Sequence, residues 1–356
     1  MSPRRALTLL ETLVVLAIVV VVVALAIPAI QKARAAADQL ICATRLRQLA
    51  TAAHLFHNDH GRLPPGWLGP SVQNSGNQDV SFAEGQWVGH MVLLLPYLEQ
   101  TALARRFDAN FDPEFVADQK WWWSQPAAGP GPPHVDNYRV AMTPLPFLRC
   151  PSAPDYAVPV GDFSMRGGGT LLGIHVFNDT SMRAPFTSFW RDEYGPASAY
   201  RPLARTNYVG VAGCGIGNHP FFSRFEGVYV NRSTRTLGQI AARDGASLTL
   251  LYGETCGSQW VSDPLSRDIS WVAAGALGTY LGIAPGSASA PLVGFSSYHL
   301  RGANFSFADG SVRMLRFTPR MPRTVDPLDP PEPWYTLQQL AGWAAGGPRD
   351  AAALED

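Results

Sequence analysis

The stretch that decides the fold reads MSPRRALTLLETLVVLAIVVVVVALAIPAIQKAR over residues 1–34. It contains an uncharged run from Thr12 to Ile27, and Leu7 to Leu10 extends this run toward the N-terminus with a single break at Glu11. The apolar stretch therefore exceeds the roughly 20 residues of helix that cross a bilayer core. The run is rich in valine, but in lipid a backbone must satisfy its own hydrogen bonds, so we expect a helix rather than a strand.

Two charged features mark the N-terminal end of this helix. Arg4 and Arg5 precede it, and positive residues stay on the cytoplasmic side of a membrane, so the chain after about residue 30 is expected outside. Glu11 is a carboxylate near the end of an apolar segment, where a charge costs free energy. One interpretation places Glu11 harmlessly at headgroup level; the functional interpretation, which we favour, gives it a dedicated cationic partner.

Here the chain resembles the type IV prepilin signal. A short basic leader, Met1–Ala6, ends in a small residue, and Leu7 would be the first mature residue, where Phe or Met is more usual. Glu11 then falls at the fifth mature position, and Pro28 falls where pilins often carry a helix-kinking proline. The resemblance implies cleavage between Ala6 and Leu7 by a prepilin peptidase, methylation of the new amine, and pairing of Glu11 with the Leu7 amine of a neighbouring subunit.

A secretory signal is the alternative interpretation of the same residues. Ala24-Leu25-Ala26 is an A-x-A site after an apolar core, and cutting there would release a soluble protein. We favour the prepilin interpretation because Glu11 stands in front of the apolar core and the helical pattern continues past Pro28.

The helical pattern extends well beyond the apolar segment. Apolar residues recur at helical spacing from Ile30 to Phe56, which predicts an amphipathic continuation. Gly61 and the following Pro64-Pro65 predict the helix end. One helix from Leu7 to about His60 would be about 80 Å long. Its first half would lie in the membrane, and its second half would need a sheet to cover its apolar stripe.

The remainder of the chain is predicted to be a head rich in short strands. The clearest signal runs from Phe305 to Leu315, which alternates in polarity on both sides of Asp309-Gly310 and therefore predicts a hairpin. A Pro-rich linker, Pro319–Pro333, precedes a predicted helix at Trp334–Ala345. The predicted strands are Trp87–Leu95, Thr206–Val211, Gly227–Val230, Ser247–Tyr252, Trp271–Ala273 and Ala303–Phe317.

These patterns predict an α+β fold in which a long N-terminal transmembrane and amphipathic helix packs on a mostly antiparallel sheet. The predicted organisation is a leader at 1–6, a transmembrane helix half at 7–30, an amphipathic continuation at 31–61, an exported β-rich head at 62–318, and a linker with a short helix at 319–356.

Within the head, several motifs resemble the domain-of-unknown-function 1559 family of pilin-like bacterial proteins. That family is known by a C-terminal His-x9-Asp-Gly signature, and here His299 is followed after nine residues by Asp309-Gly310. Other matching motifs are Cys42–Gln48, His54–His57 with Gly61–Pro65, Leu94–Gln100, Leu148–Ser152, Thr206–Tyr208, and Asp244-Gly245 with Gly253-Glu254.

The resemblance implies architecture more than activity. It implies a pilin- or pseudopilin-like protein of the bacterial inner membrane, single-pass, with a cytoplasmic N-terminus and a periplasmic or cell-surface head. The implied partners are the prepilin peptidase and other pilin-like subunits or secretion-system components. The family has also been labelled solute-binding, so an exported solute- or polysaccharide-binding surface protein is the alternative function.

Four cysteines, an even number, permit disulfides in an exported head. Cys42 and Cys150 belong to two of the family motifs, so the resemblance favours a pair between them that would join the helix to the sheet. Cys214 and Cys256 are the remaining candidates, and the other two connectivities stay open. Without a C-x-x-C motif we do not expect a structural zinc site.

Two histidine features have both a bland and a functional interpretation. His54 and His57 are three residues apart and could hold a metal, but a polar helix end, where histidine complements the dipole, is the favoured explanation. For His299 with Asp309 and Gly310 we favour a structural role in the hairpin. Calcium binding and catalysis are the alternatives there, and we expect no cofactor unless calcium binds.

Other functions find little support in the sequence. Trp121, Trp122 and Trp123 form an aromatic cluster that could stack on a sugar or a partner, although burial under a loop is the commoner fate. The chain carries 28 basic and 28 acidic side chains, which excludes a general basic footprint for nucleic acid. None of the common catalytic motifs occurs, so the sequence predicts a protein that is not an enzyme.

Overall fold

The protein is represented by a computed structural model. It describes residues 9–69, 86, 88–107, 111–114, 135–153, 171–176, 186–190, 204–214, 221–256, 258–259, 266–267, 269–286, 294–319, 332–346 and 351–355.

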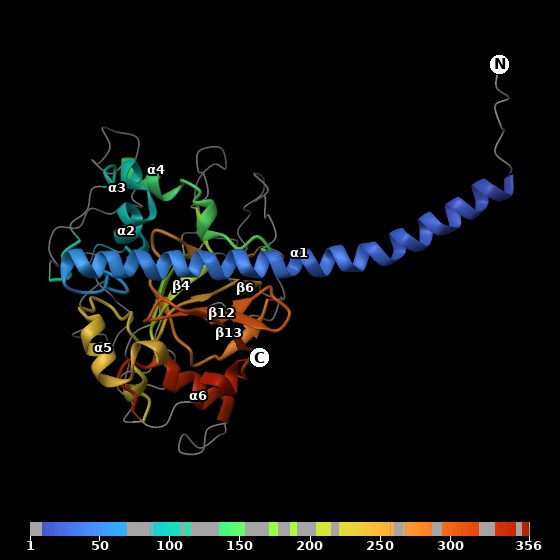
Figure 1. The fold of residues 1–356 in the computed structure, drawn as a ribbon. Coiled ribbons are helices and arrows are strands. Elements are labelled where there is room, and N and C mark those ends of the chain that lie inside the picture. The colour runs from blue at the N-terminus through green and yellow to red at the C-terminus, as the bar shows by residue number, and fades with distance from the viewer. Residues whose placement is uncertain are drawn as a thin grey trace.

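A single helix, α1 (Leu9–His60), dominates the molecule. It crosses the head and then continues beyond it as a long bare rod toward the N-terminus (Figure 1). The helix continues through Pro28 and ends where Gly61 adopts a φ of 68°, a left-handed conformation that favours glycine. The predicted long helix is therefore present, with its C-terminal boundary at His60.

The central sheet has five strands in the order β13-β12-β5-β4-β9. Neighbouring strands are antiparallel except for β4 and β9, which are parallel. The β12–β13 hairpin turns at Asp309-Gly310, where Gly310 has a φ of 83°, so the predicted hairpin is confirmed. The bounds are β4 (Tyr208–Val211), β5 (Leu250–Glu254), β9 (Ala276–Leu277), β12 (Gly302–Phe307) and β13 (Val312–Arg316).

Smaller elements surround this sheet. The helices are α2 (His90–Leu94), η1 (Leu95–Leu98), α3 (Thr101–Ala104), α4 (Val135–Ala141), η2 (Pro146–Leu148), η3 (Ser223–Phe225), α5 (Leu237–Arg243), η4 (Ala246–Leu248), α6 (Glu332–Ala341) and η5 (Ala351–Leu354). The remaining strands are β1 (Leu171–Val176), β2 (Phe186–Trp190), β3 (Arg205–Thr206), β6 (Ser258–Gln259), β7 (Ser266–Arg267), β8 (Ile269–Ser270), β10 (Ile283–Pro285) and β11 (Phe295–Ser297).

The sheet lies between α1 and α6 (Figure 1). Alternate side chains of its strands belong to two different apolar clusters, one on each face. Tyr208 belongs to the apolar cluster that contains the buried face of α1, whereas its neighbour Val209 belongs to the cluster that contains α6. This division follows from the two-residue period of a strand. The α1 residues buried against the head are Cys42, Leu46, Leu49, Ala50, Ala52, Ala53 and Phe56.

The predicted α+β class, with a long N-terminal helix and antiparallel pairing, is confirmed, but three predicted strands are wrong. The apolar run within 87–95 forms α2 and the start of η1, because a short continuous apolar run does not distinguish a strand from a buried helix. Gly227–Val230 is an irregular segment, although Gly227 N and Tyr229 N donate to the Ala212 and Val211 carbonyls, respectively. Trp271–Ala273 forms a turn after β8.

The C-terminal helix differs from its prediction only in its boundaries. It was expected at Trp334–Ala345 and is found as α6 at Glu332–Ala341. The Trp334 side chain is buried and its indole N donates to the Tyr280 carbonyl at 2.8 Å. The tail is thus packed into the head as one of the layers that cover the sheet.

Candidate functional site: a buried cysteine and histidine cluster

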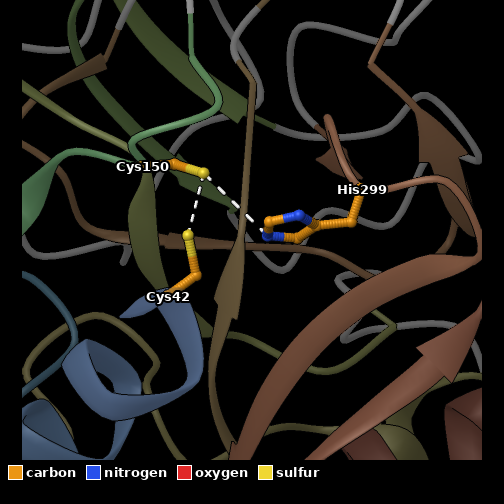
Figure 2. A group of neighbouring side chains, drawn as sticks. All are labelled: Cys42, Cys150 and His299. Carbon is orange, nitrogen blue, oxygen red and sulfur yellow. Dashed lines mark hydrogen bonds between the residues drawn. The ribbon is translucent and has the colours of Figure 1, made fainter. Parts of the chain in front are cut away.

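Three side chains from distant parts of the chain meet behind the buried face of α1 (Figure 2). Cys42 comes from α1, Cys150 follows η2, and His299 follows β11. The Sγ atoms of Cys42 and Cys150 are 2.8 Å apart, and the Nε2 atom of His299 is 3.9 Å from the Cys150 sulfur. All three residues are buried, so the cluster lies in the interior of the protein.

Glu254, the last residue of β5, completes this cluster. Its Oε2 accepts hydrogen bonds from the Ser297 hydroxyl at 2.8 Å and the Asn304 backbone N–H at 2.9 Å. Its Oε1 accepts from the Asn304 side-chain amide at 2.9 Å and lies 3.3 Å from His299 Nε2. Ser297 and Asn304 thus donate to both carboxyl oxygens, and donors of this kind favour the carboxylate form. The interior therefore holds a negative charge that His299 balances.

The proton positions follow from these contacts. His299 Nε2 faces a carboxylate and a sulfur, which both accept, so Nε2 carries a proton. Burial alone would lower the pKa of His299, but its contacts with Cys150 and Glu254 raise it to about 10.

The two thiols differ from one another for the same reason. The hydrogen bond from Cys42 lowers the pKa of Cys150 below its usual range; burial opposes this shift and the contact with His299 adds to it. That same hydrogen bond, together with burial, raises the pKa of Cys42 well above its usual range. These directions favour a Cys42 thiol that donates to a Cys150 thiolate, which in turn faces the His299 imidazolium.

The Thr206–Tyr208 motif positions Cys150 in this cluster. The Asn207 side-chain carbonyl accepts from the Cys150 backbone N–H at 2.9 Å, and its amide donates to the Thr255 carbonyl at 3.0 Å. The Asn207 carbonyl also accepts from the Thr255 N–H at 2.8 Å. One asparagine thus ties the Cys150 loop to the end of β5, next to Glu254. The structure gives this short motif a physical purpose that its sequence alone did not reveal.

The His-x9-Asp-Gly signature acts at two separate places. His299 belongs to the cysteine cluster, whereas Asp309 is exposed and its carboxylate accepts from the Ser311 N–H at 2.8 Å within its own turn. His54 of α1 lies 2.9 Å from the Ala308 carbonyl, directly before the Asp309-Gly310 turn. Each end of the signature therefore lies beside a contact with α1. His299 is next to Cys150, which contacts Cys42 of α1, and the Asp309-Gly310 turn follows Ala308, which contacts His54 of α1.

The remaining predicted site residues lie apart from this cluster. His54 bonds to Ala308, and His57 accepts from the Leu237 N–H at 3.2 Å, so the two histidines contact different partners. Cys214, which follows β4, and Cys256, which follows β5, are buried, as are Cys42 and Cys150. Glu11 and Pro28 lie on the exposed part of α1. The residues Ala6, Leu7, Trp121, Trp122 and Trp123 lie outside the described residues.

Sequence reasoning did not find the cluster as a site. The sequence suggested a pair of the two cysteines and a separate role for His299 in the hairpin. Residues 108 positions apart show no spacing pattern, so nothing joined the histidine to the cysteines. The only signal was that Cys42, Cys150, Glu254 and His299 each belong to a family motif. That signal indicates importance, but only the fold brings the four side chains together.

Within the described residues, Cys42, Cys150 and His299 are the group whose ligand atoms lie close enough for a metal, within 4.8 Å of one another. Two thiolates on one tetrahedral zinc ion, at about 2.3 Å from it, are about 3.8 Å apart. The observed sulfur separation of 2.8 Å is shorter than this by about 1 Å. The arrangement as it stands is therefore that of a thiol pair.

The fold and this cluster together define an α+β head that is carried on one long N-terminal helix and joined to it around a buried cysteine–histidine–glutamate group. The chain belongs to the family described as "Protein of unknown function (DUF1559)", whose family model matches residues 31–318. No curated protein and no solved structure matches the chain.

Proposed function

We propose that the protein is a membrane-anchored, pilin- or pseudopilin-like structural subunit, processed by a prepilin peptidase and assembled by a type IV pilus-like or type II secretion-like system. The observation that carries this proposal is the division of α1 into two halves with opposite surroundings. The N-terminal half is apolar and bare, and the C-terminal half is built into the head.

The bare half has the properties of a membrane segment. Large apolar side chains from Leu9 to Ile30 are exposed, and α1 is long and apolar enough to cross a membrane. Each Å² of apolar surface left in water costs about 25 cal/mol, so this rod needs a bilayer or other helices around it. A rod of this kind supports both stages of the proposed function: storage in the inner membrane, and packing against other subunits afterwards.

The C-terminal half of α1, which is buried against the head from Cys42 to Phe56, supports a mechanical role for the helix. The buried face of α1 belongs to the same apolar cluster as Tyr208 and Tyr252 of the central sheet. A force applied to the exposed half would therefore reach the head through a continuous helix and a packed core. This is the mechanical connection that an assembly machine needs when it draws a subunit out of the bilayer.

Glu11 is in the first turn of α1 and is exposed on the bare half. A helix tilts its side chains toward its N-terminus, so this carboxylate points toward the end where a new amine would lie after cleavage. In the proposed assembly, Glu11 pairs with the Leu7 amine of a neighbouring subunit. An ion pair in apolar surroundings adds little stability, but it does specify register.

Mass spectrometry of the mature N-terminus tests this proposal directly. A methylated Leu7 is the expected result, whereas an intact Met1 would indicate a plain anchor and Ile27 an ordinary secretory signal. Ala6→Phe should leave the leader attached, because the peptidase site then holds a bulky residue. The matched control is Ala24→Phe, which removes the A-x-A site and should leave processing at Leu7 unchanged. Normal processing of Ala6→Phe together with loss of processing in Ala24→Phe would refute the proposal.

A specific observation also supports solute binding as a second candidate function. An apolar cleft of about 400 Å³ lies at the C-terminal end of α1, with Phe56, Tyr97 and Phe111 in its lining and Arg62 and Asp112 as charged groups. This volume is within the range of small-molecule sites, and aromatic rings suit sugar faces. Titration with a panel of oligosaccharides would test it. Saturable binding that Tyr97→Ala abolishes would favour this function over assembly.

A further inference from the structure

We propose that Cys42 and Cys150 are a redox pair whose disulfide fastens α1 to the head, with Cys150 as the nucleophilic thiolate held against the His299 imidazolium. This inference goes beyond subunit assembly, because it assigns a covalent modification site and a role to a buried histidine.

The sulfur geometry comes first in support. The two Sγ atoms are 2.8 Å apart, whereas non-bonded heavy atoms in a protein interior usually approach to about 3.5–4.0 Å. Cys42 is on the buried face of α1 and Cys150 is on a loop fixed by Asn207, so neither sulfur depends on a flexible segment for this approach. The bond would close a loop of about a hundred residues, the type of cross-link that most restricts an unfolded chain.

The charges around Cys150 come second. Burial of Glu254 and His299 costs desolvation free energy, because each ion loses its hydration, and only close pairing offsets this cost. The Glu254 carboxylate, fixed by Ser297 and Asn304, keeps His299 protonated, and the imidazolium faces the Cys150 sulfur at 3.9 Å. A thiolate is the reactive form of cysteine, and an adjacent cation stabilises it. Cys42 donates its proton to Cys150, so the negative charge of the pair lies on Cys150.

The reaction balances with a disulfide-bearing oxidant such as oxidised glutathione. The Cys150 thiolate attacks one sulfur of the oxidant, forms a mixed disulfide and releases one thiolate. That thiolate takes the Cys42 proton, and the Cys42 sulfur then attacks the Cys150 sulfur and releases the second thiolate. Both cysteines are oxidised and the oxidant is reduced to two thiol equivalents. His299 and Glu254 remain afterwards as a neutral ion pair.

Formation of this disulfide in the cell rests on the proposed export of the head, because disulfides persist in oxidising compartments. With the bond closed, α1 cannot leave the sheet even under load. With the bond open, apolar packing and hydrogen bonds alone retain the helix. The experiment below reads the thiols of purified protein, so its failure is distinguishable from a failure of the N-terminal processing experiment.

The test uses the full chain in detergent micelles, reduced and then exposed to oxidised glutathione, with free thiols alkylated and peptides analysed by mass spectrometry. A Cys42–Cys150 cross-linked peptide is expected. Cys42→Ser should stop the reaction with glutathione bound to Cys150, and Cys150→Ser should leave Cys42 largely unmodified. Cys214→Ser and Cys256→Ser are matched controls that should keep the cross-link.

The role of His299 has its own measurement. His299→Gln should slow modification of Cys150 at neutral pH by about twofold or more, because the imidazolium contact contributes to the lowered pKa of this thiol. It should also reduce the thiolate ultraviolet absorbance at neutral pH. His54→Gln, which alters the other contact between α1 and the hairpin, should leave both readouts unchanged.

Two results would overturn the proposal. One is the absence of any Cys42–Cys150 cross-link while both thiols react freely after denaturation. The other is one equivalent of zinc in the purified protein, with both thiols released by a chelator; the cluster would then be a metal site. Circular dichroism of each serine variant identifies a variant that fails to fold, and the glutathione result for the other serine variant then decides.

Discussion

The Nε2 atom of His54 donates a hydrogen bond to the Ala308 carbonyl oxygen at 2.9 Å, and this contact joins α1 to the β12–β13 hairpin. A carbonyl oxygen only accepts, so the proton lies on Nε2. Cys42 lies twelve residues before His54, about 18 Å from it along the helix axis. There it contacts Cys150. The helix is thus held at two points, and both lie beside residues of the His-x9-Asp-Gly signature.

His54→Ala should lower the free energy of unfolding by about 1–2 kcal/mol, because it removes this hydrogen bond and leaves the Ala308 carbonyl without its partner. Urea denaturation of the full chain in micelles, followed by tryptophan fluorescence, measures the change. His60→Ala is the control, since His60 is exposed and both its hydrogen bond and its ring stacking are to Phe56 of its own helix. Equal losses in the two variants would contradict the contact.

The two sides of α1 should respond differently to the same substitution. Leu46→Ala should lower the free energy of unfolding by about 2–5 kcal/mol, because it leaves a cavity in the core between α1 and the sheet. Leu40→Ala should change it by less than about 0.5 kcal/mol. The two side chains are 0% and 68% exposed, respectively. A large loss for Leu40→Ala in the same denaturation experiment would mean that the head covers more of α1.

Stability should fall as the pH drops below about 6.5, through the titration of His90. This residue is fully buried, stacks on Tyr229 with ring centroids 5.0 Å apart, and donates from Nδ1 to the Gly66 carbonyl. Burial lowers its pKa from 6.5 to about 4. The unfolded chain therefore binds the proton first, so stability present above the unfolded pKa is lost as the pH falls toward the folded pKa.

The loss reaches about 3 kcal/mol for one histidine at the acid end of this window. Denaturation midpoints at pH 7 and pH 5 measure the first part of this loss, about 2 kcal/mol. His90→Asn should remove most of the pH dependence between these values, whereas the exposed His60→Asn should keep it. An unchanged slope in His90→Asn would show that another group is responsible.

Glu11→Ala should leave membrane insertion intact, because it removes a charge from the apolar segment, and should abolish incorporation into an assembled structure. Glu11→Asp, which keeps the charge on a shorter side chain, is the matched control and should retain part of the incorporation. Fractionation into membrane and sheared extracellular material measures both steps. Normal incorporation of Glu11→Ala would exclude the register role.

Local sequence patterns predicted the elements whose signals are local. The helical period from Ile30 to Phe56 and Gly61 predicted the end of α1, and Asp309-Gly310 predicted the hairpin, because periodicity and turn chemistry act over a few residues. The strand predicted at 87–95 was wrong for a related reason. That run is buried on all sides as α2 and η1, so its apolar character shows no period that could distinguish the two structures.

The candidate site was beyond local patterns. Cys42 and Cys150 are separated by 108 positions, and Glu254 and His299 by 45. Family motifs indicated that these residues matter, but not that the carboxylate of Glu254 holds the imidazole that faces the Cys150 sulfur. Asn207 shows the same limit, since its bonds to Cys150 and Thr255 depend on how a loop meets the end of β5.

The sequence by itself determined that this chain carries an apolar helix of membrane-spanning length, continues it as an amphipathic helix, and ends in a strand-rich head. Hydrophobic period and length decide these features, and both can be read along one dimension. The tertiary structure alone decided that α6 covers the second face of the sheet, that His54 bonds to Ala308, and that two cysteines, a histidine and a glutamate share one buried cluster. Such contacts depend on long-range packing, in which the burial of one side chain sets the charge and position of the next.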